Sequence, residues 1–529
     1  MARTHSGPLD SALGDMEADY VVVGSGSAGS VLANRLSAIP GVRVVVVEAG
    51  PPDKDKFIHI PAAFSKLFCS AVDWNYLTDP QKELEGRQIY WPRGKTLGGS
   101  SSINAMMWVR GFAADYDEWG ELAGPDWSFA SVEKYFKRIE NGPLVVSKQR
   151  SPRRSTATWL AAVEAQGHRV EAPNQASPEG FCETLVTQRR GARWSTADAY
   201  LKPALRRQNL KLLTEATVTR VLFDGRRAVG VEVHTGSRRE MVRVRREVLL
   251  CAGAINTPQL LMLSGIGDRD QLAEHGIDSV HHSPEVGANL RDHLAVLLGF
   301  ECPNDTLGAA EKPRELINYL TRRRGMLTSP FGEAYGFVRS RPDLELPDLE
   351  LIFAPAPFFD EGIGEPYPGH AVVTGPILLK PKSSGTITLA SADANVKPLI
   401  DPRYLSDDAG EDRAALMEGL RIAARIAECP GMRSVIGGIA RPPRVSELNE
   451  ETLEMALNTL SHTLYHPVGT CRMGADDASV VDPALRVRGV DGLRVADASV
   501  MPTIIRGHTH APSVLIGEKA ADLVRSARA

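Results

Sequence analysis

The chain has 529 residues, which is more than a single hydrophobic core supports, so two packed domains or one large domain with an inserted cap are expected. Apolar residues make up 43% and charged residues 24% of the chain, a composition that excludes a disordered protein. The formal net charge of −4 gives no electrostatic reason to expect a nucleic acid or an anionic membrane as a partner. Basic runs such as Arg322 to Arg324 are therefore interpreted as solvated surface.

The cysteines and the first residues indicate the compartment. The six cysteines are far apart and form no C-x-x-C pair, so neither a metal site nor a disulfide framework is expected. This pattern is typical of a protein of the reducing cytoplasm, which is the location we expect. Residues 1–16 lack the apolar core of a signal peptide and are expected to form a disordered tail. No run of about 18 apolar residues occurs, so no integral membrane segment is expected.

The first patterned segment is an apolar strand at residues 21–23, followed by the turn Gly24-Ser-Gly-Ser-Ala-Gly29. Helical spacing then continues to Ser37, and a second strand at 42–47 ends at Glu48. This order predicts a dinucleotide-binding βαβ unit, in which a diphosphate meets the N-terminus of the helix.

The glycines and the acid of this unit have separate roles. Gly24 permits the tight turn, Gly26 lets the backbone approach the pyrophosphate, and Gly29 lets helix and strand pack closely. Glu48 follows the glycines by about 20 residues, a spacing at which a carboxylate accepts hydrogen bonds from ribose hydroxyls. The acid disfavours a 2′-phosphate, so NADP is not expected, but the unit alone does not separate NAD from FAD.

A second glycine-rich element spans residues 93–107 and reads Arg-Gly-Lys-Thr-Leu-Gly-Gly-Ser-Ser-Ser-Ile-Asn-Ala-Met-Met. Its small residues and its cation suit a backbone that passes tightly along a pyrophosphate and a flat ring. A nicotinamide enzyme needs no such second loop, so the element favours FAD. The aromatic and proline-rich segment 57–92 is expected to form an ordered loop over the cofactor.

The later elements follow from strand and helix patterns. Ser128 is expected to cap a helix through Glu140. Another helix is expected to start at Thr257-Pro258, with Pro at its first position, and to stop at 264–265. The remaining expected elements are an antiparallel meander of strands at 210–214, 217–223, 230–234 and 242–251, strands at 348–353, 385–389 and 493–496, and helices at 413–427 and 511–525.

Three further motifs lie in the second half of the chain: residues 253–267 (Gly-Ala-Ile-Asn-Thr-Pro-Gln-Leu-Leu-Met-Leu-Ser-Gly-Ile-Gly), residues 466–474 (His-Pro-Val-Gly-Thr-Cys-Arg-Met-Gly) and Asp497-Ala498-Ser499. Together with the two glycine-rich elements, they resemble the glucose–methanol–choline (GMC) oxidoreductase family, with its choline dehydrogenases and alcohol oxidases, over nearly the whole chain. The resemblance implies an α/β fold with a Rossmann-like FAD-binding domain built from discontinuous segments, and an α+β substrate-binding domain with an antiparallel sheet. The expected segments are 17–150, 190–300 and 462–529 for the FAD-binding domain, and 151–189 and 301–461 for the substrate-binding domain.

The resemblance also implies how FAD is held. Val218 would meet the adenine through its backbone, and Asp497 with Ala498 would lie at the ribityl and pyrophosphate groups. Some members attach FAD covalently through a histidine immediately before the asparagine that matches Asn104. Here that residue is Ile103, so noncovalent binding is expected. The residues expected to bind FAD are Gly24, Gly26, Ser27, Ala28, Gly29, Glu48, Trp74, Gly94, Lys95, Leu97, Gly99, Asn104, Ala105, Met106, Met107, Val218, Ala252, Gly253, Asp497, Ala498 and Thr509.

The implied reaction is oxidation of a CH–OH group to a carbonyl. A histidine removes the hydroxyl proton, because its ordinary pKa lies near neutrality, and flavin N5 accepts the hydride. The resemblance assigns His466 as the principal base and His508 as the residue that hydrogen-bonds the substrate oxygen, while His462 and His510 are expected to be structural. Pro512 fits the first turn of the last helix, so amides around residues 509–511 would face the negative charge of reduced flavin.

The substrate and the electron acceptor stay open. Phenylalanines at 337, 353, 358 and 359 suggest an apolar wall, whereas Glu333 and Glu350 could recognise a cation such as choline. Glu350 lies in an alternating strand and could instead face water. Aryl and aliphatic alcohols, polyols, sugars and choline, with oxygen, a quinone or another carrier as acceptor, are all compatible with the sequence. The alternatives are a flavin-containing lyase of the hydroxynitrile type and an NAD-dependent dehydrogenase. The oligomeric state is not predicted.

Overall fold

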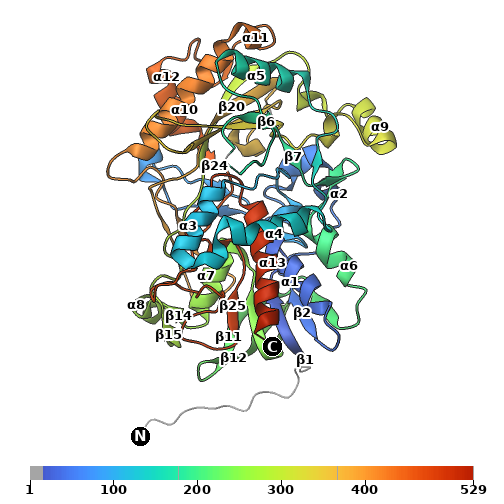
Figure 1. The fold of residues 1–529 in the computed structure, drawn as a ribbon, viewed down its shortest axis with the longest axis vertical. Helices are drawn as coiled ribbons and strands as arrows, with labels where there is room; N and C mark the ends of the chain where they lie inside the picture. Colours follow the sequence, from blue (N-terminus) through green and yellow to red (C-terminus); the bar gives the residue numbers. More distant parts are fainter. Residues whose placement is uncertain (1–15, 177, 366, 528–529) are drawn as a thin grey trace.

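The computed structural model describes residues 16–176, 178–365 and 367–527. The expected tail lies outside these ranges except for Met16, which begins strand β1. Two sheets organise the chain, one in the lower and one in the upper half of the molecule in Figure 1. The architecture is the expected α/β one, with an antiparallel sheet in the second half. No helix within the described ranges is long and apolar enough to cross a lipid bilayer.

The first sheet has seven strands in the order β10-β2-β1-β13-β12-β11, with β25 also paired to β13. Its parallel strands β1, β2 and β25 are apolar and buried along nearly their whole length, as expected for a sheet covered on both faces, and β13 is buried where it pairs with the end of β1. β11 and β12 continue it as an antiparallel pair beyond β13. The strands are β1 (Met16–Val23), β2 (Val44–Val47), β10 (Leu210–Leu213), β11 (Thr217–Asp224), β12 (Arg227–Thr235), β13 (Arg238–Leu250) and β25 (Leu493–Val495).

One part of the predicted meander is wrong. β11, β12 and β13 form it, but β10 pairs in parallel with β2 at the opposite edge of the sheet, with Leu210 beside Val44. An apolar strand pattern shows which face is buried and carries no information about the partner strand, so sequence proximity was misleading here.

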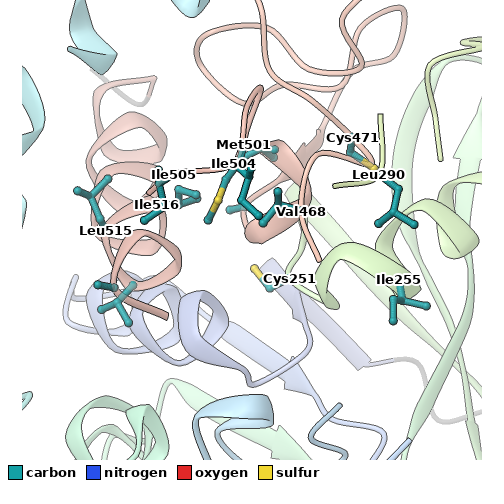
Figure 2. Close-up of a cluster of buried hydrophobic side chains, with 14 of the residues drawn as sticks. Cys251, Ile255, Leu290, Val468, Cys471, Met501, Ile504, Ile505, Leu515 and Ile516 are labelled. Atoms are coloured by element: carbon teal, nitrogen blue, oxygen red, sulfur yellow. The ribbon is translucent and has the colours of Figure 1, made fainter. Parts of the chain in front are cut away.

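Helices α1 (Ser27–Ser37) and α7 (Gly253–Leu263) pack against strands of this sheet, and α13 (His510–Ser526) packs on α1. α1 and α13 cross so closely that a Cβ at Gly517 would stand 2.9 Å from Ala28 Cα. Figure 2 shows the core between these helices and the end of β13, where the side chains come from segments far apart in the sequence. Its labelled members are Cys251, Ile255, Leu290, Val468, Cys471, Met501, Ile504, Ile505, Leu515 and Ile516.

The start of α7 differs from the prediction. The helix begins at Gly253, so Pro258 lies inside it rather than at its first position. A proline in a helix leaves the carbonyl four residues earlier without its amide donor. Here Thr470 Oγ1 donates to that carbonyl, Ala254 O, at 2.6 Å. The helix therefore tolerates Pro258 because a hydroxyl from a distant segment replaces the missing hydrogen bond.

The second sheet has eight strands and is antiparallel throughout. Helices α10 (Glu411–Glu428) and α5 (Arg154–Ala165) pack against it. Its strands β16 and β17 span residues 294–301, which lie almost entirely in the segment 190–300 that was expected for the FAD-binding domain. The strands are β6 (Phe181–Glu183), β16 (Leu294–Val296), β17 (Leu298–Glu301), β18 (Ala334–Val338), β19 (Leu349–Ala354), β20 (Ala371–Leu378), β23 (Ile439–Arg441) and β24 (Ser461–Thr463).

The remaining helices and short strands connect these layers. The expected helix at 128–140 is α4 (Phe129–Glu140), but the Ser128 hydroxyl donates to Pro125 O at 2.8 Å instead of capping the helix amides. The other elements are α2 (Lys56–His59), α3 (Ala113–Ala123), α6 (Lys202–Ala204), α8 (Arg269–Glu274), α9 (Pro313–Arg322), α11 (Pro430–Arg433), α12 (Glu450–Leu460), β3 (Tyr76–Leu77), β4 (Tyr90–Trp91), β5 (Ser147–Lys148), β7 (Leu185–Val186), β8 (Gln188–Arg189), β9 (Ala192–Arg193), β14 (Ile266–Gly267), β15 (His281–His282), β21 (Thr386–Thr388) and β22 (Leu399–Asp401).

Candidate active site

A single large cavity connects the glycine turn after β1 with the segment around His466. Its empty space is about 2090 Å³ with the solvent-filled opening included. The first sheet supplies one end of the lining, and residues such as Leu297 and Ile352 of the second sheet region supply the other. No group of three or more His, Cys, Asp or Glu side chains suited to a metal occurs among the described residues.

The glycine turn after β1 and the second glycine-rich loop, residues 93–107, contact each other at the end of the cavity that the first sheet lines. Gly24 has φ +96°, and a Cβ there would stand 2.5 Å from Cys251 O. Gly99 has φ +52°, and a Cβ there would stand 2.8 Å from Gly26 Cα. A side chain at either position would thus separate the loop from its neighbour. The contact brings the backbone of the second loop to the N-terminus of α1, where an anion is stabilised by the helix amides.

Glu48 is buried beside this contact. Its carboxylate accepts hydrogen bonds from Ser25 N at 2.9 Å, Ser25 Oγ at 2.7 Å and Gly50 N at 2.9 Å. Burial raises the pKa of Glu48, and these hydrogen bonds and the nearby Lys95 act in the opposite direction. The network holds the acid at the end of β2 and at the cavity wall.

Most of the residues expected to bind a cofactor line this cavity, and three do not. Gly29 packs against the Gly24 turn, where a Cβ would be 2.0 Å from Gly24 O. The Lys95 ammonium lies 4.7 Å from the centre of the Trp74 ring, and Leu97 belongs to the buried core. The residues that line the cavity are Gly24, Gly26, Ser27, Ala28, Glu48, Trp74, Gly94, Gly99, Asn104, Ala105, Met106, Met107, Val218, Ala252, Gly253, Asp497, Ala498 and Thr509.

The N-terminus of α13 also faces the cavity. Thr509, His510 and Ser513 line it, and the helix begins at His510, one residue before the predicted start. Ser27 Oγ lies 3.1 Å from His510 Nδ1, whereas His510 Nε2 is buried and has no hydrogen-bond partner among the described residues. Burial lowers the pKa of His510 to about 4, so the ring is neutral. A buried polar nitrogen of this kind fits a ligand that supplies the missing partner.

At the other end of the cavity the two predicted histidines lie together. The ring centres of His466 and His508 are 4.9 Å apart. A third histidine, His293, contacts His466 with 2.9 Å between the two Nδ1 atoms. His293 precedes β16 and is completely buried.

The hydrogen bonds of His293 determine the tautomer of His466. His293 Nε2 lies 3.0 Å from Leu379 O, and because a carbonyl only accepts, this nitrogen carries a proton. Burial, with the nearby His508, lowers the pKa of His293 to about 3, so its Nδ1 is an unprotonated acceptor. His466 must therefore donate from Nδ1–H. Burial and the neighbouring His508, His293 and Arg93 hold the pKa of His466 well below its usual range, which leaves a lone pair on Nε2.

The backbone of His466 is held separately. Its amide donates to Asp292 Oδ1 at 2.7 Å, and Asp292 Oδ2 accepts from Thr463 Oγ1 at 2.6 Å and from the Tyr404 hydroxyl. Burial raises the pKa of Asp292 to about 6 in spite of these hydrogen bonds. Residues 292–293 therefore orient His466 through both its backbone and its ring.

His508 is held by a carboxylate from the second sheet. Its Nε2 lies 3.0 Å from Glu350 Oε1, and Glu350 on β19 is completely buried. A carboxylate accepts, so His508 Nε2 donates. The second oxygen, Glu350 Oε2, has no hydrogen-bond partner among the described residues. The alternation of this strand had allowed Glu350 to face water, but every side chain of β19 is buried, because α5 and α10 cover one face of the sheet and the segment that carries His508 covers the other.

Aromatic side chains form the wall around the histidines. Phe358 does so as predicted, together with Phe64, Phe68 and Phe331, and the rings of Phe331 and Phe358 are 4.6 Å apart. The other three phenylalanines lie elsewhere: Phe337 packs on Phe112, Phe353 on Trp159, and Phe359 under the Arg441 guanidinium. Residue type alone did not distinguish a cavity wall from a core.

Glu333 is also not in the cavity. It is buried and accepts hydrogen bonds from Thr156 Oγ1, Ser329 Oγ and Arg153 N. These contacts make it a structural acid that connects three segments.

Sequence reasoning missed Arg93, His293 and Asp292. Arg93 lines the cavity, and its charge is one of the influences that lower the pKa of His466. It opens the second glycine-rich element, so its position offered a signal. Asp292 and His293 lie in no recognised motif, and only the folded chain brings them to His466.

A parallel sheet with a glycine turn, a second glycine loop and a cavity that ends at paired histidines defines a dinucleotide-dependent oxidoreductase. Two family models described as GMC oxidoreductase match residues 18–295 and 381–517. The chain belongs to the GMC family of FAD-dependent oxidoreductases.

The comparisons include characterised and uncharacterised relatives. An uncharacterized GMC-type oxidoreductase of Mycobacterium tuberculosis is 67% identical over 528 residues, covering 97% of this chain and 100% of that protein. An alcohol dehydrogenase [acceptor] of Pseudomonas putida is 42% identical, covering 96% of this chain and 95% of that protein. The structure of a formate oxidase of Aspergillus oryzae, studied for FAD modification, has a TM-score of 0.90 at 28% identity and covers 97% and 98% of the two chains.

Proposed function

We propose that this protein oxidises a CH–OH group to the carbonyl, with His466 as the base that removes the hydroxyl proton. The observation that carries the proposal is the hydrogen-bond chain from Leu379 O through His293 to His466 Nδ1, which leaves Nε2 as an acceptor beside the cavity. A general base needs a lone pair and a pKa that keeps it unprotonated at the working pH. The alcohol dehydrogenase of Pseudomonas putida, at 42% identity, supports the substrate class.

The residues at the glycine end fit FAD. Gly24 makes the tight turn, and Gly26 and Gly99 let the two loops meet without side chains at the N-terminus of α1, where a pyrophosphate would bind. Glu48 stands where its carboxylate would accept hydrogen bonds from a ribose, and the unpartnered His510 Nε2 points to a missing ligand group. Bound FAD supplies the hydride acceptor. We further propose that FAD is held noncovalently, because Ile103, in the position before Asn104, is buried among aliphatic side chains and carries no nucleophile.

The chain's own residues prepare the alcohol. His466 Nε2 accepts the hydroxyl proton as the substrate carbon loses its hydride. His508, held by Glu350, contributes the second ring at this point, and its Nδ1 has no hydrogen bond to any described residue. Because the hydroxyl proton goes to His466, His508 would need a proton on Nδ1 to donate a hydrogen bond to the substrate oxygen. The surrounding phenylalanines exclude water and so strengthen these polar contacts.

The substrate that this pocket fits best is an uncharged alcohol with an apolar group. The wall of Phe64, Phe68, Phe331 and Phe358 gives a large apolar contact. Neither Glu333 nor Glu350 is among the residues that line the cavity, and one carboxylate oxygen of Glu350 already accepts from His508, which leaves little negative charge at the wall for a quaternary ammonium. Choline is therefore the second candidate, with Glu350 Oε2 as the group that would favour it.

The test is anaerobic reduction of the purified protein with a panel of aryl, aliphatic, polyol and choline substrates, followed by flavin absorbance. The proposal predicts bleaching, fastest with apolar alcohols. Absence of bleaching together with cleavage of a cyanohydrin would establish the lyase alternative, and a colourless preparation that reduces NAD would establish a nicotinamide dehydrogenase.

Substitution of His466 tests whether this side chain is the catalytic base or only supports the structure. His466→Ala is expected to slow flavin reduction by about 10²- to 10⁴-fold with FAD retained. His275→Ala is the matched control, because the His275 ring makes one hydrogen bond, between Nε2 and Leu389 O at 3.1 Å, and lies outside the cavity lining. A near-normal rate in His466→Ala would refute the assignment.

A further inference from the structure

Helix α9 (Pro313–Arg322) is amphipathic, but its apolar face points to solvent instead of the protein interior. Leu316, Ile317 and Leu320 are exposed at 45%, 62% and 62%, whereas Tyr319 is the buried residue of the helix. With Pro313 they recur at the spacing of one helix face, so they form a single apolar stripe. Within the described ranges no other helix exposes more than one large apolar side chain.

The opposite face of α9 ties the helix to the molecule. The Tyr319 hydroxyl donates to His59 O at 3.1 Å, and Glu315 Oε2 accepts from Met326 N at 3.2 Å. Lys66 forms an ion pair with Glu311, just before the helix. These contacts fix the direction in which the stripe points, which is away from the body, and Figure 1 shows α9 projecting at the side of the upper half.

The stripe is flanked by cations. Residues 311–324 carry five Lys or Arg side chains against two carboxylates, although the whole chain has a net charge of −4. Lys312 and Arg314 lie at the start of the helix, Arg322 ends it, and Arg323 and Arg324 follow it, all of them exposed. The two carboxylates are engaged by Lys66, Arg314 and the Met326 amide. An apolar stripe between basic ends is the pattern of a helix that lies in a lipid interface.

We propose that α9 docks the protein on an anionic lipid bilayer, with Leu316, Ile317 and Leu320 in the acyl boundary and the flanking basic side chains at the lipid phosphates. Charge selects this occupant over a second copy of the chain. A two-fold pairing of α9 with itself would bring two clusters of positive charge together, whereas an anionic surface neutralises them.

The position of α9 connects this surface with the cavity. The short helix η7 (Met326–Thr328) follows α9 and contacts both it and η1 (Pro61–Leu67). Phe64 of η1 and Phe331 after η7 line the cavity, with ring centres 5.5 Å apart. α9 therefore packs on η7, which in turn packs on the element that carries Phe64. A bilayer bound at α9 would thus lie beside the phenylalanine-lined end of the cavity.

The experiment is co-sedimentation of the full-length, FAD-loaded protein with vesicles of phosphatidylcholine, alone or mixed with phosphatidylglycerol. We expect sedimentation with the mixed vesicles, loss of it in high salt, and at least about tenfold weaker partitioning when Leu316, Ile317 and Leu320 are all changed to Ser. The matched control changes Leu77, Leu122 and Met455 to Ser, since these are single exposed apolar residues on other elements. Retained flavin colour and an unchanged melting temperature verify that both variants are folded.

Any of three results would overturn the proposal. The first is wild-type protein that stays in solution with mixed vesicles at low salt, and the second is a stripe variant that sediments like the wild type. The third is a wild-type dimer in light scattering that becomes a monomer in the stripe variant without any vesicle binding, which would make α9 a contact between copies.

Discussion

Replacing His293 with Leu removes the group that holds the proton on His466 Nδ1. The wild-type contact is 2.9 Å long between two buried rings, and Leu has no acceptor to replace it. His466 stays in place because its amide remains bonded to Asp292. The variant therefore tests the tautomer of the base separately from its presence.

The expected loss follows from one hydrogen bond. A neutral hydrogen bond contributes about 0.5–1.5 kcal/mol, and about 1.4 kcal/mol corresponds to a factor of ten. The share of His466 in the tautomer that accepts at Nε2 should thus fall by roughly two- to tenfold, and the rate of flavin reduction with it. This is well below the roughly 10²- to 10⁴-fold loss for removal of the base itself. Substrate affinity should change little, because the defect lies in proton transfer.

Stopped-flow reduction of the anaerobic enzyme measures this rate over a range of pH. His293→Gln restores an acceptor and should recover most of the rate, and His275→Leu serves as the matched histidine control. His293 is neutral well above its own pKa of about 3, so its removal takes no positive charge away from His466 near neutral pH, and the variant reports on the hydrogen bond. A folded His293→Leu protein with the wild-type rate and pH profile would refute the tautomer argument.

Three other outcomes are expected. Glu350→Gln removes the charge that holds His508, and since hydrogen bonds to charged groups contribute about 1.5–3 kcal/mol, flavin reduction should slow by roughly ten- to hundredfold; an unchanged rate would remove Glu350 from the site. The pKa of His466 lies well below its ordinary value of about 6.5, and the base works unprotonated, so kcat/KM should be flat from pH 8 to about 6.5 and decline only at more acid pH; a half-maximal point above pH 7 would contradict this. Acid precipitation should release all FAD into the supernatant because Ile103 offers no covalent attachment, and a yellow pellet would show otherwise.

Local elements were predictable where local chemistry decides them. The strand, glycine turn, helix and second strand from β1 to β2 follow from contacts within the unit, as does α13 with Pro512 in its first turn. The start of α7 and the partner strand of β10 could not be predicted, because each depends on a segment far away in the sequence. Thr470 stabilises α7 from outside the helix, and β10 joins a strand formed near residue 44.

The candidate site divides in the same way. His466 and His508 were found because each lies in a recognisable motif, and the structure places their rings together. Their partners were not found, since His293 is 173 residues from His466 and Glu350 is 158 residues from His508. Burial reversed the interpretation of Glu350, because covering an alternating strand on both faces removes the distinction between inward and outward positions.

The pairing of β25 with β13 has a consequence for synthesis of the protein. When the ribosome has released residue 250, β1, β2, β10 and β13 exist, but the β25 side of β13 is an open edge until residues 493–495 emerge. Both histidines and the α13 terminus arrive in the same late stretch. The nascent chain thus exposes this strand edge and an incomplete cofactor site for nearly half of its translation, so the fold places a lasting demand on chaperones. A chain terminated early is expected to aggregate rather than survive as an isolated domain.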